Sequence, residues 1–364
     1  MQKDTILIAG AGPVGLAAAL FLSRTGVRPR VIDKLDSPSP FSKAFGVNPR
    51  TLSLLESTGA TEIFLKNGRK MPAINVYRND RLLIRNRFST VAHPYPFLLI
   101  QSQADSEAIL SELLLKAGIS VERGIELTTV STDADGVTAQ LKHPGGRVES
   151  FTADYIFAAD GAHSSVRKGL GLDFEGDTYE EKWLLYDVEL EVSVDQDEGH
   201  ALILDEGGLF MVRIQGDIWR VIGNLPDLLN HLPRGCRVGQ THWQSNFGVS
   251  HRVTERLNVG RIYLGGDAAH IHAALGARGM NLGIEDAYVF AKLYASAQLD
   301  QYHQRRNKVV KDTIKRIHGL TDVMRGKTRF SKVFRAVAPV VLPAVFPLIK
   351  SDIREFVLGL DHEV

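Results

Sequence analysis

Residues 261–286 read RIYLGGDAAHIHAALGARGMNLGIED. The stretch opens with an apolar run, Ile262 to Leu264, which predicts a short buried strand. A glycine pair and Asp267 end that strand, and a second glycine-rich loop leads into an amphipathic helix. A carboxylate at a strand end can accept hydrogen bonds from sugar hydroxyls, and glycines let the backbone approach a flat ring. The free N–H groups of a helix start favour negative charge. This combination favours a flavin nucleotide.

The beginning of the chain carries a second nucleotide pattern. Residues 5–9 form a continuous apolar run, residues 10–15 read GAGPVG, and residues 16–25 have a helical pattern. In such a motif the first glycine permits a tight turn, the second lets the pyrophosphate approach, and the third lets helix and strand pack closely. An acid at the end of the next predicted strand is expected to hold the adenosine ribose. The residues predicted to contact the nucleotide here are Gly10, Gly12, Pro13, Val14, Gly15, Asp33 and Lys34.

The glycine motif alone leaves NAD and FAD undecided. NAD dehydrogenases do not need a Gly-Asp strand end far downstream, whereas folds that wrap an extended FAD do. The chain has no second GxGxxG that would form a separate nicotinamide-binding domain. The sequence therefore predicts bound FAD.

The remaining pattern predicts an α/β fold with an inserted sheet. Helices are expected over 51–57 and 106–118, strands with a turn at Asp135-Gly136 over 120–139, and a buried strand over 154–159. Four alternating runs, 183–192, 201–204, 209–214 and 218–222, indicate a mostly antiparallel sheet. We expect a Rossmann-like FAD domain, an inserted β-rich substrate domain and a helical C-terminal segment after Asp286. The FAD domain is assigned 1–72, 97–178 and 253–364, and the substrate domain 73–96 and 179–252.

Composition narrows the function classes. The 364 residues carry 43 Lys and Arg against 42 Asp and Glu, which gives no electrostatic case for nucleic acid. The single cysteine, Cys236, excludes an intramolecular disulfide and fits a reducing compartment. The first apolar run is the predicted cofactor strand rather than a signal peptide, so a cytoplasmic protein is expected. The oligomeric state is not predicted.

The apolar segment 333–349 contains Pro339, Pro343 and Pro347. Three prolines at four-residue spacing forbid a straight helix. Packing against the body of the protein is the first expectation for this segment. Peripheral contact with a lipid surface is the alternative.

With these motifs in order, the chain resembles the single-component FAD-dependent aromatic hydroxylases of the p-hydroxybenzoate hydroxylase type. The resemblance implies an FAD domain of the glutathione-reductase type. The family's middle Asp-Gly motif, tied to FAD and NAD(P)H, matches Asp160-Gly161, and its Gly-Asp motif matches Gly266-Asp267. The resemblance implies that Asp267 binds ribityl or ribose oxygens, that Gln103 touches the flavin chain, and that Lys43 lies near the pyrophosphate. Further cofactor contacts are expected at Leu127, Gly279, Met280 and Asn281.

The resemblance also implies a reaction. NAD(P)H would reduce FAD, and the reduced flavin would react with O₂ to give a C4a-hydroperoxide that hydroxylates an aromatic or related activated small molecule. No catalytic triad is expected, because the cofactor carries the chemistry. The chain has Ala273-Ala274 where the family commonly has proline, which leaves the backbone carbonyl of Ala274 as the one catalytic candidate. Arg278 is a basic variant within the family's glycine-rich turn.

The sequence says less about the residues that contact the substrate. Phe210, Arg213 and Trp219 are candidate substrate contacts, with Phe210 and Val212 expected on one face of the sheet and Met211 and Arg213 on the other. Solvent exposure of Arg213 and core packing of Trp219 are the alternatives. His270 and His272 lack the carboxylate or cysteine partners of a zinc site, so no metal is expected.

Three other functions stay open. A flavin-dependent halogenase would need a Trp-x-Trp-x-Ile-Pro signature, and residues 219–226 have one tryptophan and the wrong spacing. An FAD-dependent reductase of an isoprenoid-type substrate is a second possibility. A flavin-loaded, non-catalytic partner protein is the third.

Overall fold

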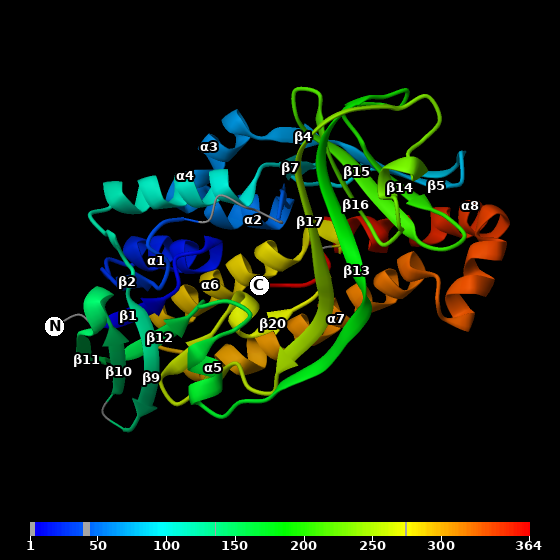
Figure 1. The fold of residues 1–364 in the computed structure, drawn as a ribbon. Coiled ribbons are helices and arrows are strands. Elements are labelled where there is room, and N and C mark those ends of the chain that lie inside the picture. Colours follow the sequence, from blue (N-terminus) through cyan, green and yellow to red (C-terminus); the bar gives the residue numbers. More distant parts are fainter. Residues whose placement is uncertain (1–3, 39–43, 135, 274) are drawn as a thin grey trace.

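A computed structural model of the chain describes residues 4–38, 44–134, 136–273 and 275–364 (Figure 1). It begins with the predicted strand, glycine turn and helix. Strand β1 (Ile6–Ala9) is buried along its whole length, and helix α1 (Pro13–Arg24) starts directly after Gly12. Proline at the first helical position needs no N–H bond there and fits the required φ angle. The α1 helix ends at Thr25, and strand β2 (Arg30–Asp33) then pairs in parallel with β1.

A six-stranded sheet forms the centre of the predicted FAD domain. Its order is β18-β19-β12-β1-β2-β8, and all neighbours are parallel except β18 and β19. The carboxyl ends of the parallel strands therefore lie at one edge, where ligands bind in open α/β sheets. The other strands are β8 (Val121–Arg123), β12 (Tyr155–Ala158), β18 (Asn258–Val259) and β19 (Ile262–Leu264).

Helices and two small sheets surround this centre. Helix α1 packs between α4 (Gln103–Lys116) and α6 (Gly279–Ala295). The predicted strands around residues 120–139 are confirmed, but they belong to two sheets: β8 is the edge strand of the six-stranded sheet, and the two that follow form a three-stranded sheet whose third strand the sequence analysis missed. Asp135 itself lies outside the described residues. One small sheet consists of β9 (Glu126–Thr132), β10 (Val137–Lys142) and β11 (Val148–Ala153). The other consists of β3 (Gly46–Val47), β7 (Leu98–Ile100) and β4 (Arg69–Met71). The remaining helices of this part are α2 (Pro49–Leu55), α3 (Ala60–Asn67) and α5 (Ser165–Gly169).

An eight-stranded sheet forms the second unit. Its order is β20-β17-β13-β16-β15-β14-β5-β6, and every neighbouring pair is antiparallel except β14 and β5. The four predicted runs are confirmed as strands, but a long strand over 237–254 was missed. The strands are β5 (Ala73–Arg78), β6 (Arg81–Arg87), β13 (Phe174–Glu191), β14 (Gly199–Ile203), β15 (Gly208–Gln215), β16 (Ile218–Gly223), β17 (Arg237–Thr254) and β20 (His270–Ile271).

Strands β13 and β17 run from one unit into the other (Figure 1). Each has 18 residues, and they pair from Phe174–Thr254 to Glu191–Arg237. Both strands continue without a break through the predicted domain boundaries at 178/179 and 252/253. The division into two domains stays a prediction about organisation, because one ribbon belongs to both.

Two long helices, α7 (Tyr302–Arg325) and α8 (Arg329–Leu358), complete the C-terminal segment. The prolines do not end α8, which continues past all three to Leu358, but it bends around the outer edge of the second sheet instead of running straight (Figure 1). Residues after Leu358 are not helical and return to the centre of the molecule. There the Lys292 ammonium donates to the Val364 carbonyl at 3.1 Å.

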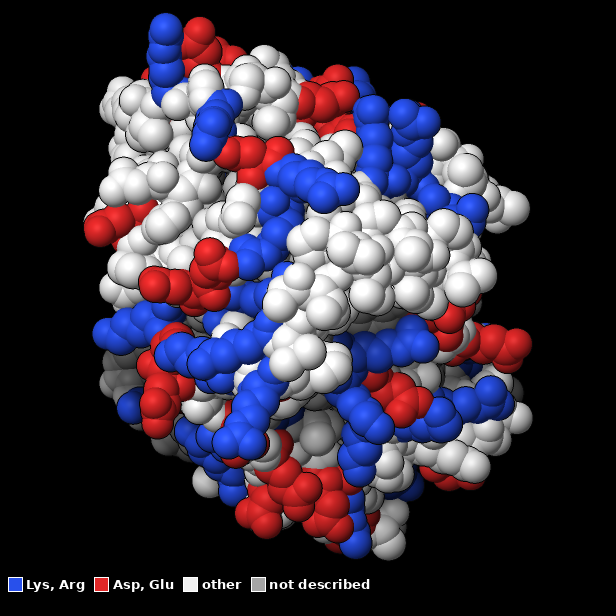
Figure 2. Space-filling model, turned by 90° about the vertical axis from the view of Figure 1, so that its right-hand side faces the viewer, with Lys and Arg blue, Asp and Glu red and all other residues white. Residues whose placement is uncertain are grey.

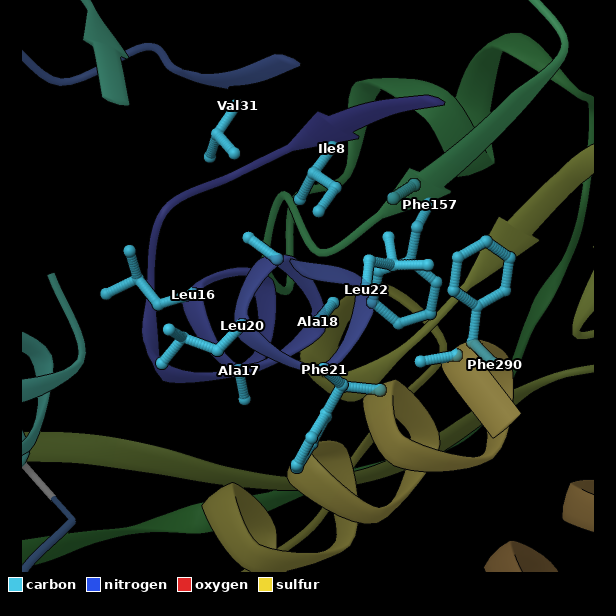
Figure 3. Packing of buried hydrophobic residues seen from close by; sticks show 14 of the residues in the cluster. Ile8, Leu16, Ala17, Ala18, Leu20, Phe21, Leu22, Val31, Phe157 and Phe290 are labelled. Atoms are coloured by element: carbon cyan, nitrogen blue, oxygen red, sulfur yellow. The ribbon is translucent and has the colours of Figure 1, made fainter. Parts of the chain in front are cut away.

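The core of the FAD domain packs between α1, the parallel sheet and α6 (Figure 3). Phe157 from β12 and Phe290 from α6 are both fully buried, with ring centroids 4.8 Å apart. Gly265 lies against the same rings, since a Cβ there would be 2.4 Å from the Phe157 ring. The core therefore fixes where β19 ends and the Gly-Asp loop begins.

A second contact joins the long ribbon to α7. The His251 ring on β17 meets Tyr179 on β13 edge-on at 5.0 Å and lies 5.1 Å from the His318 ring on α7. Neither ring nitrogen of His251 has a hydrogen-bond partner among the described residues. Burial, and then the neighbouring His318, lower the pKa of His251 to about 4.

Replacing Phe290 with alanine should lower the free energy of unfolding by about 3–5 kcal/mol, because it removes a buried ring and leaves a cavity. Phe330→Ala is the matched control, since that ring is 70% exposed and its loss should cost less than about 0.5 kcal/mol. Denaturant unfolding of both variants measures the difference. Equal midpoints for the two variants would contradict this description of the core.

His251 should also make stability depend on pH. In the unfolded chain the His251 imidazole binds a proton below about pH 6.5, whereas in the folded chain it does so only near pH 4. The contribution of the neutral ring to the free energy of unfolding is therefore complete above about pH 6.5 and is lost as the pH falls from about 6.5 to about 4. His251→Phe should remove up to about 3 kcal/mol of that loss. The measurement is unfolding at pH 7 and pH 4, with the exposed His163→Phe as control. Parallel pH curves for wild type and His251→Phe would refute the prediction.

Candidate cofactor site

The first cavity lies at the carboxyl ends of β1, β2 and β12 and has a volume of about 240 Å³. Asp33 ends β2 and lines the cavity, with one carboxylate oxygen accepting from the Ala11 N–H at 2.6 Å. Its other oxygen accepts from the Leu35 N–H at 2.8 Å. Seven predicted cofactor contacts line this cavity: Gly10, Gly12, Asp33, Lys34, Gln103, Leu127 and Asp160.

The three motif glycines have different roles. Gly10 has a φ of +103°, and a Cβ there would lie 2.2 Å from the Ala159 carbonyl oxygen. A Cβ at Gly15 would lie 1.9 Å from the Gly10 carbonyl oxygen. Gly12 differs, because a Cβ there would meet nothing within 4 Å and would enter the space that both cavities share. Gly10 and Gly15 are therefore required by the fold, and Gly12 leaves room that fits a ligand backbone.

The Asp-Gly motif joins two loops of the site. One Asp160 oxygen accepts from the Ser165 N–H at 2.8 Å and the Val166 N–H at 3.2 Å, which caps α5. The other Asp160 oxygen is buried and has no partner among the described residues. The Arg167 guanidinium donates to the Ala162 carbonyl at 2.9 Å and the Ala268 carbonyl at 2.8 Å. Arg167 thus ties this loop to the Gly-Asp loop, and Asp160 keeps one acceptor for a ligand.

The second cavity continues from the first and has a volume of about 450 Å³. The two share Gly12, Gln103, Ala159 and Gly161, so together they form an extended path across the carboxyl ends of the sheet. This path fits a dinucleotide bound end to end. The predicted contacts that line the second cavity are Gly12, Pro13, Val14, Gln103, Asp267, Gly279, Met280 and Asn281.

Gly266 lies behind the cavity wall rather than in it. Its φ is +58°, and a Cβ there would be 2.8 Å from the Val14 side chain. Its N–H donates to the buried Asp286 carboxylate at 3.0 Å. Gly266 therefore lets the loop pass close to α1, which places the exposed Asp267 at the cavity.

The start of α6 forms one side of the second cavity. The Asn281 side chain is buried; it accepts from the Asn48 N–H at 3.0 Å and donates to the Gly46 carbonyl at 2.9 Å and to the Ala277 carbonyl. Because both amide protons are used, this side chain holds β3 and α2 against the helix. The N–H groups of the first turn, which have no partner inside the helix, remain for a ligand.

Two polar side chains at this cavity were missed as site residues by the sequence analysis. Arg278 is buried and donates to the Phe356 carbonyl at 2.8 Å, but its Nε and Nη2 have no partner among the described residues. The His272 Nδ1 lies 2.8 Å from the Ala273 carbonyl, and its Nε2 is buried without a described partner. Burial lowers the pKa of His272 to about 3, so its ring is neutral at pH 7. Both residues stood out in the sequence, as a basic variant of the glycine-rich turn and as part of a His-x-His pair, but a local pattern does not predict where their side chains point.

The His270 side chain is buried and is held by a neighbouring carboxylate. Its Nε2 lies 2.6 Å from the buried Asp286 carboxylate. In the described part of the chain, no group of three or more His, Cys, Asp or Glu residues is arranged to hold a metal ion.

Aromatic side chains line the side of the second cavity that faces the eight-stranded sheet. Phe45 and Phe247 line the cavity, and the Phe210 ring stacks on Phe45 at 6.4 Å. Phe210 and Val212 pack in one core cluster and Met211 in another, which confirms the predicted alternation along β15. The cavity-side face of the sheet is therefore the one that carries Phe210.

Arg213 and Trp219 lie on the opposite face and line neither cavity described above. Arg213 on β15 pairs directly with Trp219 on β16. Because side chains alternate between the two faces of a strand, and Arg213 is three residues after Phe210, both side chains point away from the face that carries Phe210. The Arg213 guanidinium is 2.8 Å from Asp197, and Trp219 is buried in the core. Their proposed substrate contacts therefore have no support from the geometry. Trp219 packs in the core, as its alternative expected, whereas Arg213 is only partly exposed and is held in an ion pair.

The arginine on the cavity-side face is Arg220, which the sequence analysis missed. It forms a buried, two-bond ion pair with Asp187, both bonds at 2.7 Å. Its guanidinium also lies 5.5 Å from the Phe45 ring and 5.4 Å from the Trp243 ring. A one-residue difference in position along β16 decides which side chain faces the cavity. Lys43 and Ala274 lie outside the described residues.

Comparisons with known proteins agree with this geometry. A family model described as FAD binding domain matches residues 3–221 and 228–317. The 6-methylpretetramide 4-monooxygenase of Streptomyces rimosus is 33% identical, over 99% of this chain and 68% of the relative. Pentachlorophenol 4-monooxygenase of Sphingobium chlorophenolicum is 28% identical, over 88% of this chain and 65% of the relative. The chain thus spans about two thirds of the length of these relatives.

A solved structure of similar length has the same fold. The p-nitrophenol 4-monooxygenase of Pseudomonas putida DLL-E4 superimposes with a TM-score of 0.88 and 22% identity, over 99% of each chain.

Replacing Gly12 with leucine should leave the apoprotein folded and abolish FAD retention, since the side chain would occupy the shared part of the two cavities. FAD affinity should fall by at least about 100-fold, or about 3 kcal/mol. Flavin absorbance and fluorescence quenching measure the affinity, and circular dichroism checks the fold. Gly319→Leu is the control, because Gly319 on α7 also has open space but lines neither cavity. Full flavin content in Gly12→Leu would show that the cofactor lies elsewhere.

Proposed function

We propose that this chain, which belongs to the FAD binding domain family and is a flavin-dependent aromatic monooxygenase, takes its electrons from NAD(P)H. Its substrate is a small aromatic molecule, which is hydroxylated while it lies against the aromatic wall of the second cavity. The balanced reaction consumes NAD(P)H, O₂, a proton and an aromatic C–H group. One oxygen atom enters the new hydroxyl group and the other leaves as water. Bound FAD supplies the redox and oxygen-activating chemistry.

The observation that supports this proposal most is the path formed by the two cavities. Its adenosine end is at Asp33 and its other end is at Phe45 and Phe247, with Gly12 and Gly161 between them. An extended dinucleotide in this path would place its reactive ring beside apolar and aromatic side chains. Such surroundings exclude water, which protects a reactive oxygen species from side reactions.

We assign the cofactor contacts along this path by position. Asp33 and Lys34 would serve the adenosine ribose, Gly10 to Val14 the pyrophosphate, and Asp267 the ribityl chain. Gln103 lines both cavities and Asp160 lies between Ala159 and Gly161, which also line both, so the two residues suit the middle of the cofactor. Leu127 would contact the adenine side. Gly15 and Gly266 would act by close packing, and Lys43 and Ala274 keep the roles that the family resemblance implies for them.

The flavin end would be held by α6. The N–H groups at Gly279 to Asn281 and the unpartnered Arg278 nitrogens offer positive charge to the flavin ring. Arg278 cannot lose its proton at physiological pH, even though burial lowers its pKa. Neutral His272 offers an acceptor at Nε2. The helix N–H groups and Arg278 would stabilise negative charge on the bound cofactor without moving, and the His272 Nε2 would accept a hydrogen bond from a donor group of the ligand.

The substrate would lie between this end and the eight-stranded sheet. Phe210, stacked behind Phe45, supports a flat apolar ligand. The Arg220 guanidinium, already held by Asp187, would orient Phe45 and Trp243 rather than meet a substrate anion. A phenol or fused polycyclic phenol is the substrate class that fits, in a reducing, cytoplasmic setting.

NAD(P)H oxidation should be slow in the absence of substrate and should rise at least about tenfold when a suitable phenol binds, a change of about 1.4 kcal/mol in the barrier. The chain has no second GxGxxG to hold a nicotinamide permanently, so the substrate is expected to gate reduction. Stopped-flow reduction of the bound flavin, with phenols, quinone precursors and polycyclic phenols, measures the effect, and a saturated ring analogue is the control.

Isotope labelling separates the alternatives. A monooxygenase incorporates one atom of ¹⁸O from ¹⁸O₂ into the product. Reduction of an isoprenoid double bond without incorporation would indicate the reductase, and no reduction with any ligand would indicate a non-catalytic flavin protein. Equally fast flavin reduction with and without substrate would contradict the gated reaction.

A further inference from the structure

The outer face of α8 is apolar and open to solvent. From Val333 to Ile349 every exposed side chain is apolar, and the one charged residue, Arg335, is buried. The exposed fractions reach 77% at Val340 and 83% at Leu348. The large exposed apolar side chains of α8 are Phe330, Val333, Val337, Val340, Val341, Val345 and Leu348; we call them the α8 stripe.

The inner face of the same helix is already occupied. Phe334, Ala338, Leu342 and Phe346 recur at four-residue spacing and pack on strand β6. The α8 stripe lies on the remaining surface, so the fold of this chain does not use it. Figure 2 shows a continuous uncharged bulge on this side of the molecule. Apolar patches of this kind on soluble proteins mark an interaction site.

Cationic side chains border the stripe. Arg329 lies before it, Lys332 lies between its first two members, Phe330 and Val333, and Lys350 follows its last member, Leu348; all three cations are exposed and form no ion pair with any described residue. Arg81 and Arg87 on the adjoining β6 are also exposed and unpaired within the described ranges. Lys and Arg border most of the bulge in Figure 2.

The position of two of these charges is informative. Arg329 and Lys332 stand in the first turn and a half of α8, and this turn contains no acidic residue. The helix dipole disfavours cations there, so these residues do not serve helix stability. An anionic surface in contact with the stripe would make them favourable.

The helix is long and apolar enough to cross a membrane by length and composition alone, but two features favour an interfacial position. The prolines leave the carbonyls of Arg335, Pro339 and Pro343 without their helical N–H partners, which is costly inside hydrocarbon. Arg335 donates to the Val323 and Met324 carbonyls, at 2.8 and 2.7 Å from Nη2, which ties the helix to the protein. Water and headgroups at a membrane surface can satisfy the free carbonyls.

We propose that α8 docks this protein on an anionic lipid bilayer. The α8 stripe enters the boundary between headgroups and acyl chains, and Arg329, Lys332 and Lys350 meet lipid phosphates. The helix lies along the surface with its inner face still packed on β6.

Vesicle co-sedimentation of the full, FAD-loaded chain tests this proposal. The protein should bind phosphatidylcholine vesicles that contain phosphatidylglycerol, bind pure phosphatidylcholine weakly, and dissociate as salt increases. The double variant Val340→Asp, Leu348→Asp should bind at least about tenfold more weakly. Leu115→Asp is its control, because Leu115 is 66% exposed on α4, outside the stripe.

Charge reversal tests the border separately. Lys332→Glu with Lys350→Glu should lower binding to the anionic vesicles only, whereas Lys66→Glu on α3 should not. Retained flavin absorbance shows that each variant is folded. Absence of binding to anionic vesicles, or equal binding of wild type and the stripe variant, overturns the proposal. A dimer in light scattering that Val340→Asp, Leu348→Asp dissociates also overturns it, since the stripe would then contact a second copy.

Discussion

The buried carboxylate of Asp286 organises the cofactor site. It accepts from the Gly266 N–H at 3.0 Å, lies 2.6 Å from His270 and pairs with Arg306 at 2.7 Å. Burial alone would raise the pKa of Asp286, but Arg306 and His270 lower it, and the net direction is down. A buried charge is stable only when its partners are all in place. Since Asp286 belongs to α6 and Gly266 to the Gly-Asp loop, the same bonds fix the loop and the helix start, which are two walls of one cavity.

This ion-pair system continues to the end of the chain. Arg306 lies 3.3 Å from Glu285, whose carboxylate is 2.7 Å from His362. The neighbouring Asp361 is 3.3 Å from Arg278, which lines the second cavity. Burial lowers the pKa of His362, but Asp361 and Glu285 outweigh it, so the pKa is raised and the charged form is favoured. Residues far apart in sequence thus form a connected series of ion pairs beside α6. Through this series the C-terminal segment supports the cavity wall.

Local patterns predicted part of this structure. The β1-α1-β2 unit, helices α2, α4 and α6 and four strands of the second sheet follow from apolar spacing and glycine positions, because these constraints act within a few residues, whereas α3 and α5 were not predicted. Strand β17 was missed because its polar sequence is held mainly by pairing with β13, a contact of high sequence separation. For Arg213 and Arg220, alternation gave the relative faces but not which face meets the cavity, since that depends on how the sheet docks. The partners of Asp286 also come from three separate segments, and no sequence period links them.

The eight-stranded sheet connects the two ends of the molecule. One edge strand, β20, contains His270 and belongs to the Gly-Asp loop, and the other, β6, lies under α8. An open edge strand invites pairing with other chains, so it is covered. A straight helix could follow a twisted edge over only a short distance, whereas the prolines let α8 curve along it (Figure 1). This role explains the inner face and the bend of α8. Covering the edge does not require an apolar outer face. The proposed contact with a lipid surface accounts for that face.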